Sequence, residues 1–337
     1  MRGKTKVLKG LLYAAITAVL LLQAQSAFAA DNSAPDNETG GRGIDMLRYN
    51  ATNAANATNS TNSMAYMAYA SKEEARSLLS EAVAYLRDNG RDDALLEFND
   101  PSGPFVRGDL YIFAYDLNGT CLAHPIKPEL IGQKGLLDIN GVDVVDRELR
   151  LAERGGGSMY IVFQNPGYEG KEELKQIYIE NTDYGLYLGS GYYLSNISAS
   201  FSREEIDGLV AFVEEARQFA QESGRQKSLE VFNDPAGKFS RDGSYIFAYD
   251  YEGRTLALPY QPELLDTIRI DAEDPNGVDY IRQIMDAAQD GGGFTYYIYP
   301  DPSQNMLPEL KISYAVNVDG NWLLGSGIYS RSEEKTE

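Results

Sequence analysis

The chain has 337 residues, a length that predicts two compact domains on the usual scale of roughly 100–200 residues each. It carries 30 Lys+Arg against 50 Asp+Glu, and the formal net charge of −20 repels a phosphate backbone, so we expect no nucleic-acid partner. Cys121 is the single cysteine and His124 the single histidine. These counts exclude an internal disulfide framework and metal sites of the His/Cys type, and no motif for a cofactor is present.

The N-terminus has the pattern of a secretory signal. Basic residues within the first nine positions precede the apolar run Leu11–Leu22, and Ala27-Phe28-Ala29 supplies an A-x-A cleavage pattern. We expect residues 1–30 to be a signal peptide, with a retained N-terminal anchor as the alternative. The protein is then secreted, periplasmic or held at the cell surface. No later apolar run reaches the roughly 20 residues that span a bilayer, so a signal would enter the cell through a separate membrane receptor.

Residues 31–70 are rich in Asn, Ala, Thr and Ser and poor in large apolar side chains. Such a segment buries too little surface to offset its ordering entropy, so we expect a disordered linker. The rest of the chain is a tandem repeat. The string YIFAYD begins at Tyr111 and again at Tyr245, an offset of 245 − 111 = 134, and later motifs repeat at 136. We therefore expect two domain-sized modules, residues 71–197 and 202–330, and a tail at 331–337.

Each copy opens with an amphipathic helix. Ser71 and Glu74 form a capping-box pattern before a 3.6-period apolar stripe that Gly90 closes, and the segment from Ser202 to Gly224 repeats it. In the first copy, strand-like segments and one further apolar helical stripe follow, at 111–116, 121–125, 142–152, 159–164, 174–180 and 186–193. Helix, two strands, helix and three strands with short connections predict an α+β fold, an antiparallel sheet with its helices on one face.

The order of these motifs resembles a known family. The strings YIFAYDLNGTCLAHPIKPELIG, DINGVD, LKQIYI and GSGYY are similar to the single Cache domain of the second type (sCache_2), a PAS-like extracytoplasmic sensor module. The resemblance covers Ser71–Leu194 and, more weakly, Ser202–Tyr329. It implies that each module holds a small extracellular metabolite, such as a short carboxylate, between its sheet and its loops. It also implies ligand binding for signal transduction, without catalysis.

Aromatic and ionisable residues on the expected strands are the candidate ligand-binding side chains. Strand alternation places Tyr111, Phe113 and Tyr115 on one face, as core or as pocket wall. Lys175 lies in an apolar strand, where it either neutralises a ligand carboxylate or extends from a sheet edge. His124 lies beside the ligand region in the family pattern, as a ligand contact or a structural histidine. The whole candidate set is Tyr111, Phe113, Tyr115, His124, Tyr160, Lys175, Tyr178, Tyr245, Tyr249, Lys311 and Tyr314.

Two departures limit these expectations. Leu258 replaces His124 in the second copy, which puts the ligand of the second module in doubt. The spacing of Asp138, Asn140 and Asp143 resembles the first ligands of a calcium-binding loop. The twelfth position, which is glutamate in an EF-hand, is Leu149 here. We therefore expect these residues to form Asx-turns and a helix N-cap. The sequence thus favours a small-molecule sensor or solute-binding protein. The alternative is a surface scaffold that binds no small ligand.

Overall fold

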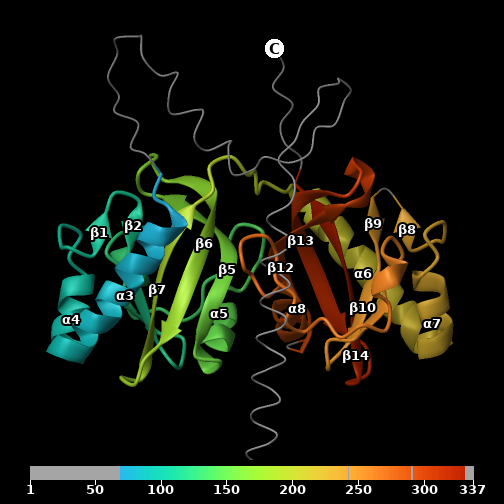
Figure 1. The fold of residues 1–337 in the computed structure, drawn as a ribbon, viewed down its shortest axis with the longest axis horizontal. Helices are drawn as coiled ribbons and strands as arrows, with labels where there is room; N and C mark the ends of the chain where they lie inside the picture. Colours follow the sequence, from blue (N-terminus) through green and yellow to red (C-terminus); the bar gives the residue numbers. More distant parts are fainter. Residues whose placement is uncertain (1–68, 242, 290, 331–337) are drawn as a thin grey trace, which may run out of the picture. The chain divides into compact units, whose positions relative to one another are not determined.

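The computed structural model describes residues 69–241, 243–289 and 291–330. The expected signal peptide, nearly all of the expected linker and the expected tail lie outside these residues. The same order of elements occurs twice along the chain (Figure 1). The expected ranges 71–197 and 202–330 are called here the first module and the second module. Within the described part, no helix combines the length and the apolarity that crossing a membrane requires.

The first module begins with two helices. In α3 (Lys72–Asn89), the Ser71 hydroxyl accepts a hydrogen bond from Glu74 N at 3.2 Å, and the Glu74 carboxylate accepts one from Ser71 N at 2.7 Å. This capping box satisfies two of the orphan donors at the helix start. The helix ends at Gly90, whose φ of 83° favours glycine. The expected bounds of this helix are confirmed, whereas the short helix α4 (Arg91–Phe98) was not expected.

A five-stranded antiparallel sheet forms the centre of the first module, in the order β4-β3-β7-β6-β5. YIFAYD, expected as one strand, is divided, because Tyr111 ends a strand of a separate small hairpin and the large sheet starts at Phe113. The strands are β1 (Val106–Arg107), β2 (Leu110–Tyr111), β3 (Phe113–Asp116), β4 (Cys121–Ala123), β5 (Gly156–Asn165), β6 (Lys171–Asn181) and β7 (Leu186–Tyr193).

Helices cover both faces of this sheet, so the expectation of helices on one face was wrong. The long helix α3 packs against β7, and α5 (Val144–Glu153) packs against β5 and β6. Ile112 and Ala114 belong to the buried cluster under α3, whereas Phe113 and Tyr115 belong to the cluster that includes α5. A 3.6-residue periodicity shows that one side of a helix is buried but does not show which face of the sheet covers it.

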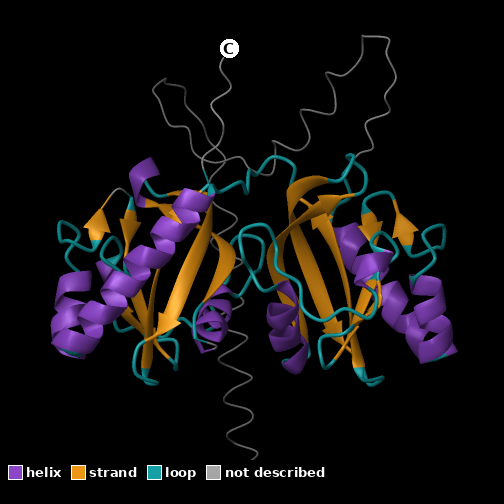
Figure 2. Ribbon diagram, turned by 180° about the vertical axis from the view of Figure 1, so that it is seen from behind, coloured by secondary structure: helices purple, strands orange, loops and turns teal. Residues whose placement is uncertain are grey.

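The second module repeats the first, with sheet order β11-β10-β14-β13-β12 (Figure 2). The predicted α+β class, with two antiparallel sheets and a long helix at the start of each module, is confirmed. The elements of the second module are α6 (Arg203–Ser223), α7 (Arg225–Phe232), β8 (Ser240–Arg241), β9 (Ser244–Tyr245), β10 (Phe247–Asp250), β11 (Thr255–Ala257), α8 (Tyr280–Gln289), β12 (Gly293–Asp301), β13 (Leu307–Asn317) and β14 (Trp322–Tyr329).

Candidate functional site

A small cavity lies between α5 and the sheet of the first module. Its volume is about 20 Å³, enough for one water-sized occupant. Aromatic and aliphatic side chains form most of the wall, and three ionisable groups interrupt it. All but Leu136, which is half-buried, are buried. The lining residues are Tyr111, Phe113, Tyr115, His124, Leu136, Val144, Glu148, Ile161, Phe163 and Lys175.

Lys175 extends from β6 into this cavity and is only 1% exposed. Its Nζ lies 3.8 Å from the ring centroid of Tyr111 and 4.9 Å from that of Tyr193. Among the described residues no hydrogen-bond acceptor pairs with it. Burial lowers the pKa of this ammonium to about 7, although Asp109 and Glu148 act in the opposite direction. Cation–π contacts stabilise the charge in part, and an anion in the cavity would stabilise it further.

Glu148 lines the same cavity from α5 and is 2% exposed. Burial raises the pKa of its carboxyl to about 8, against the hydrogen bond that the Tyr187 hydroxyl donates at 2.9 Å and against the charge of Lys175. The carboxyl is therefore mostly protonated at neutral pH and can itself donate a hydrogen bond. Glu148 is not among the site residues predicted from the sequence. The signal was its spacing, four residues after Val144 and four before Ala152, on the apolar stripe of the helix.

His124 completes the polar groups of the cavity. Its Nδ1 accepts a hydrogen bond from Lys127 N at 3.0 Å, so the ring proton resides on Nε2. Burial lowers the pKa of the imidazole to about 3, and the neighbouring Lys175 charge lowers it further in the same direction. The ring is thus neutral at physiological pH. Nδ1 is thus occupied by the bond within the loop, whereas Nε2–H remains a neutral hydrogen-bond donor on a ring that lines the cavity.

The corresponding lysine of the second module has a different environment. Lys311 is equally buried, and burial lowers its pKa to about 7. Its Nζ donates to the Tyr245 hydroxyl at 3.0 Å and to the Tyr329 hydroxyl at 3.4 Å, and Tyr329 in turn donates to Pro300 O at 2.7 Å. The charge of Lys311 therefore has acceptors within its own module, which Lys175 lacks among the described residues.

Larger side chains fill the interior of the second module. At the offset of 136 residues, three tyrosines stand where the first module has smaller or less polar residues, and two of their rings, Tyr280 and Tyr297, stack at 4.9 Å. Two of the three polar groups of the first cavity, His124 and Glu148, are replaced by aliphatic residues, whereas the lysine is kept. The pairs, first module then second, are Val144 and Tyr280, Ile161 and Tyr297, Phe163 and Tyr299, Glu148 and Ile284, and, at offset 134, His124 and Leu258.

The structure brings together eight of the eleven candidate residues, in two groups. Five line the cavity of the first module: Tyr111, Phe113, Tyr115, His124 and Lys175. The other three of these eight lie in the second module. Tyr245 and Tyr249 belong to its core, and Lys311 donates a hydrogen bond to the Tyr245 hydroxyl.

The other three candidates lie elsewhere. The Tyr160 hydroxyl donates to Asp274 of the second module at 3.0 Å. Tyr178 packs against the cluster under α3, and Tyr314 packs against the cluster under α6. Strand alternation accounts for this arrangement, because Tyr160 and Ile161 point to opposite sides of β5 and only Ile161 reaches the cavity.

Comparison with known proteins gives a family match over most of the chain. The model of the Cache domain (dCache_2) matches residues 101–334. The sensor histidine kinase MctS of Rhizobium johnstonii is 33% identical over 92 residues, which are 27% of this chain and 20% of the kinase. The chain thus matches about a fifth of the length of that relative.

Similar solved structures include sensory domains of chemotaxis proteins. A methyl-accepting chemotaxis protein from Vibrio parahaemolyticus is 29% identical, with a TM-score of 0.33, over 36% of this chain and 86% of that one. A Cache chemosensory domain described for carboxylic acid recognition is 23% identical, with a TM-score of 0.30, over 36% and 88%. The ligand-binding domain of Pseudomonas fluorescens chemoreceptor CtaA, solved with L-isoleucine, is 13% identical, with a TM-score of 0.22, over 75% and 82%.

Proposed function

The chain belongs to the Cache-domain family, and on that premise we propose that it is an extracytoplasmic sensing or solute-binding protein whose first module binds a small carboxylate. The observation that carries the proposal is the buried Lys175 ammonium, which has ring faces around it and no acceptor among the described residues. A ligand carboxylate would supply the missing anion. In this function the protein binds and releases its ligand unchanged.

Three polar groups define how the ligand would be held. One carboxylate oxygen pairs with Lys175 Nζ, and the His124 and Glu148 side chains donate hydrogen bonds to the remaining lone pairs. The aromatic and aliphatic wall contacts a short apolar tail. Because the cavity holds only about 20 Å³, the ligand has few carbon atoms and its entry displaces part of the wall. Leu136, the half-buried wall residue, marks the side that opens.

The second module takes a structural role in this proposal. Its lysine is paired internally with tyrosine hydroxyls, and its counterparts of His124 and Glu148 carry no polar group. This observation favours a scaffold role, without a small ligand, for the second module alone. Each module then corresponds to one single Cache domain of the second type, of which the first keeps a ligand site. The signal passes through a separate membrane protein that recognises the liganded chain.

A thermal-shift experiment on the chain from Asp31 onward tests the proposal. The panel contains formate, acetate, propionate, lactate and pyruvate, and each acid is paired with its neutral amide. A ligand that binds only the native state stabilises it by about 2.7 kcal/mol at a hundredfold excess over Kd, so we expect the melting temperature to rise with at least one acid. The amide of the same shape should have no effect, since it cannot neutralise Lys175. If none of the acids raises the melting temperature, the proposal is contradicted.

The affinity for the acid should fall as the pH rises from 6 to 8. With a pKa of about 7, Lys175 is mostly protonated at pH 6 and mostly neutral at pH 8, so binding at the higher pH must first take up a proton. Ionisation of Glu148 with its pKa of about 8 adds repulsion in the same direction. We expect Kd to increase about tenfold over this interval. Isothermal titration calorimetry in two buffers of different ionisation enthalpy measures both the Kd and the proton uptake.

A further inference from the structure

Among the contacts between the two modules is a pair of reciprocal hydrogen-bond sets. The Tyr160 hydroxyl donates to Asp274 Oδ2 at 3.0 Å and accepts from Asn276 Nδ2 at 2.8 Å. In the opposite direction the Tyr296 hydroxyl donates to Asp138 Oδ2 at 2.9 Å, and it accepts from Asn140 Nδ2 at 2.7 Å. Each residue of the first set is related to its counterpart by 136 positions, so the contact is two-fold symmetric like that of a homodimer.

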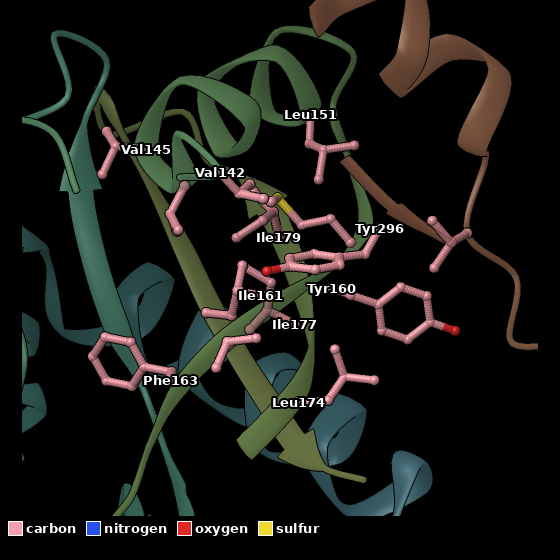
Figure 3. Packing of buried hydrophobic residues seen from close by; sticks show 14 of the residues in the cluster. Val142, Val145, Leu151, Tyr160, Ile161, Phe163, Leu174, Ile177, Ile179 and Tyr296 are labelled. Atoms are coloured by element: carbon pink, nitrogen blue, oxygen red, sulfur yellow. The ribbon is translucent and has the colours of Figure 1, made fainter. Parts of the chain in front are cut away.

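Figure 3 shows the rings of Tyr160 and Tyr296 near each other, with their hydroxyls pointing in opposite directions. Around them the buried cluster of the first module continues into the second, where it includes Ile298 and Leu310. Each hydroxyl donates one hydrogen bond and accepts one, and both tyrosines are buried. The contact therefore joins the modules by specific geometry as well as by apolar burial.

Each aspartate also holds its own module's turn and strand together. Asp138 Oδ1 accepts from Asn140 N at 2.9 Å and Val142 N at 3.0 Å, while Oδ2 accepts from Val162 N of β5 at 3.1 Å. Asp143 caps α5 through a bond from Asp146 N at 3.1 Å. The Asx-turn and N-cap expected from the sequence are thus confirmed. One carboxylate consequently connects the turn, strand β5 and the Tyr296 hydroxyl of the second module.

The same strand and turn form part of the cavity wall. Ile161 and Phe163 of β5 line the cavity, whereas the Tyr160 side chain, on the opposite side of the strand, reaches Asp274. The backbone amide of Val162, between the two wall residues, donates to Asp138. Leu136, two residues before Asp138, also lines the cavity, and its carbonyl accepts from Val144 N at 2.8 Å. Because the cavity is smaller than any carboxylate of two or more carbons, an occupant has to displace this wall.

We propose that the reciprocal Tyr–Asp–Asn contact is the output of the cavity: an occupant displaces β5 and the 136–143 turn and thereby changes how the first module holds the second. This inference rests on the proposed function, because the natural occupant is the small carboxylate. The element with two states is the contact itself, which is either formed or broken. It lies on one side of β5, and the cavity lies on the other. Coupling between the two places is reciprocal, so a change at the contact must also alter ligand affinity.

Hydrogen exchange of the chain from Asp31 onward, followed by mass spectrometry, tests the coupling. The reporters are the peptides that contain the amides of Val162 and Ile298, which donate to Asp138 and Asp274. The wall is displaced in two ways, by a saturating acid from the panel and by Ile161→Tyr, which introduces the side chain present at this position in the second module. We expect the exchange rate at Ile298, in the module without the cavity, to change at least threefold with both. Val144→Leu, which adds one methylene, replaces the first variant if that variant melts without cooperativity.

A second experiment tests the coupling in the opposite direction, from the contact to the ligand site. Tyr296→Phe removes the hydroxyl between Asp138 and Asn140 and should change Kd for the acid at least fivefold. The matched control is Tyr184→Phe, which loses a hydroxyl bonded to Arg87 O under α3, and should leave Kd unchanged. If an acid binds but neither the exchange at Ile298 nor the effect of Tyr296→Phe appears, the coupling is overturned and the ligand site stands. If no acid binds, the proposed function fails and the exchange of the Ile161→Tyr variant alone decides the coupling.

Discussion

Replacing Lys175 by methionine should weaken binding of the acid about 100-fold while the unliganded protein becomes more stable. The loss in affinity follows because a hydrogen bond to a charged group contributes about 1.5–3 kcal/mol in a buried site. The gain in stability follows because methionine fills a similar volume without the desolvation cost of a buried charge, and we expect about 1–3 kcal/mol. Calorimetric titration gives the first quantity, and urea denaturation gives the second.

The gain in stability should depend on pH. The pKa of Lys175 falls from its ordinary 10.5 in the unfolded chain to about 7 in the folded protein, so the unfolded state binds more protons between these values. The native protein therefore recovers stability as the pH rises through this window, and it bears the whole cost below pH 7. The advantage of Lys175→Met should be largest below pH 7 and should decline towards pH 10. An advantage that is constant with pH would show that the ammonium is not the cause.

Lys311→Met in the second module is the matched comparison. Lys311 donates to the hydroxyls of Tyr245 and Tyr329, so its removal leaves buried oxygens with one donor fewer. We expect no gain in stability from this variant and no change in affinity for the acid. Equal losses of affinity in the two lysine variants would place a ligand in both modules. A loss only in Lys311→Met would move the site to the second module.

Local sequence patterns were sufficient to predict the features that depend only on residues close together along the chain. The capping box of Ser71 and Glu74, the cap at Asp143 and the shared face of Tyr111, Phe113 and Tyr115 all follow from spacings of two to four residues. These features could be predicted because turn and strand geometry fixes them before any tertiary contact forms. Because the same motifs recur at offsets of 134 and 136 residues, each prediction could be made for the second module as well.

Features that depend on which surfaces meet could not be predicted in this way. Glu148 interrupts an apolar stripe, and only the structure places it in the same cavity as Lys175. Tyr160 and Ile161 are neighbours on one strand, and strand alternation separates them without showing which side is the cavity. The sequence contained no local sign that one side of β5 faces a second module. A polar residue on an apolar stripe is the signal that would have found Glu148.

Replacing Asp274 by alanine should destabilise the protein by about 3–5 kcal/mol, the largest stability loss that we expect from a single substitution. Its carboxylate accepts from the amides of Asn276, Val278 and Ile298 and from the Tyr160 hydroxyl, and the residue is 7% exposed. Alanine leaves these four donors without an acceptor, and each buried donor left unpaired costs about 1–3 kcal/mol before any relaxation. Urea denaturation of the chain from Asp31 onward measures the loss, and a value below 1 kcal/mol would mean that water replaces the carboxylate.

The symmetric substitution separates the contribution of the contact from that of the turn. Asp138 accepts the same four kinds of donor but is half-buried, so Asp138→Ala should cost less than Asp274→Ala, since water reaches the donors that it leaves behind. Tyr160→Phe removes the hydroxyl that bonds to Asp274 and Asn276 across the contact, and it should cost about 1–2 kcal/mol. Combined with Asp274→Asn in a double-mutant cycle, it should show an interaction energy of at least 0.5 kcal/mol, because the two side chains are direct partners. Strict additivity would instead mean that Asp274 stabilises its own turn and strand and that its bond to Tyr160 adds nothing to the contact between the modules.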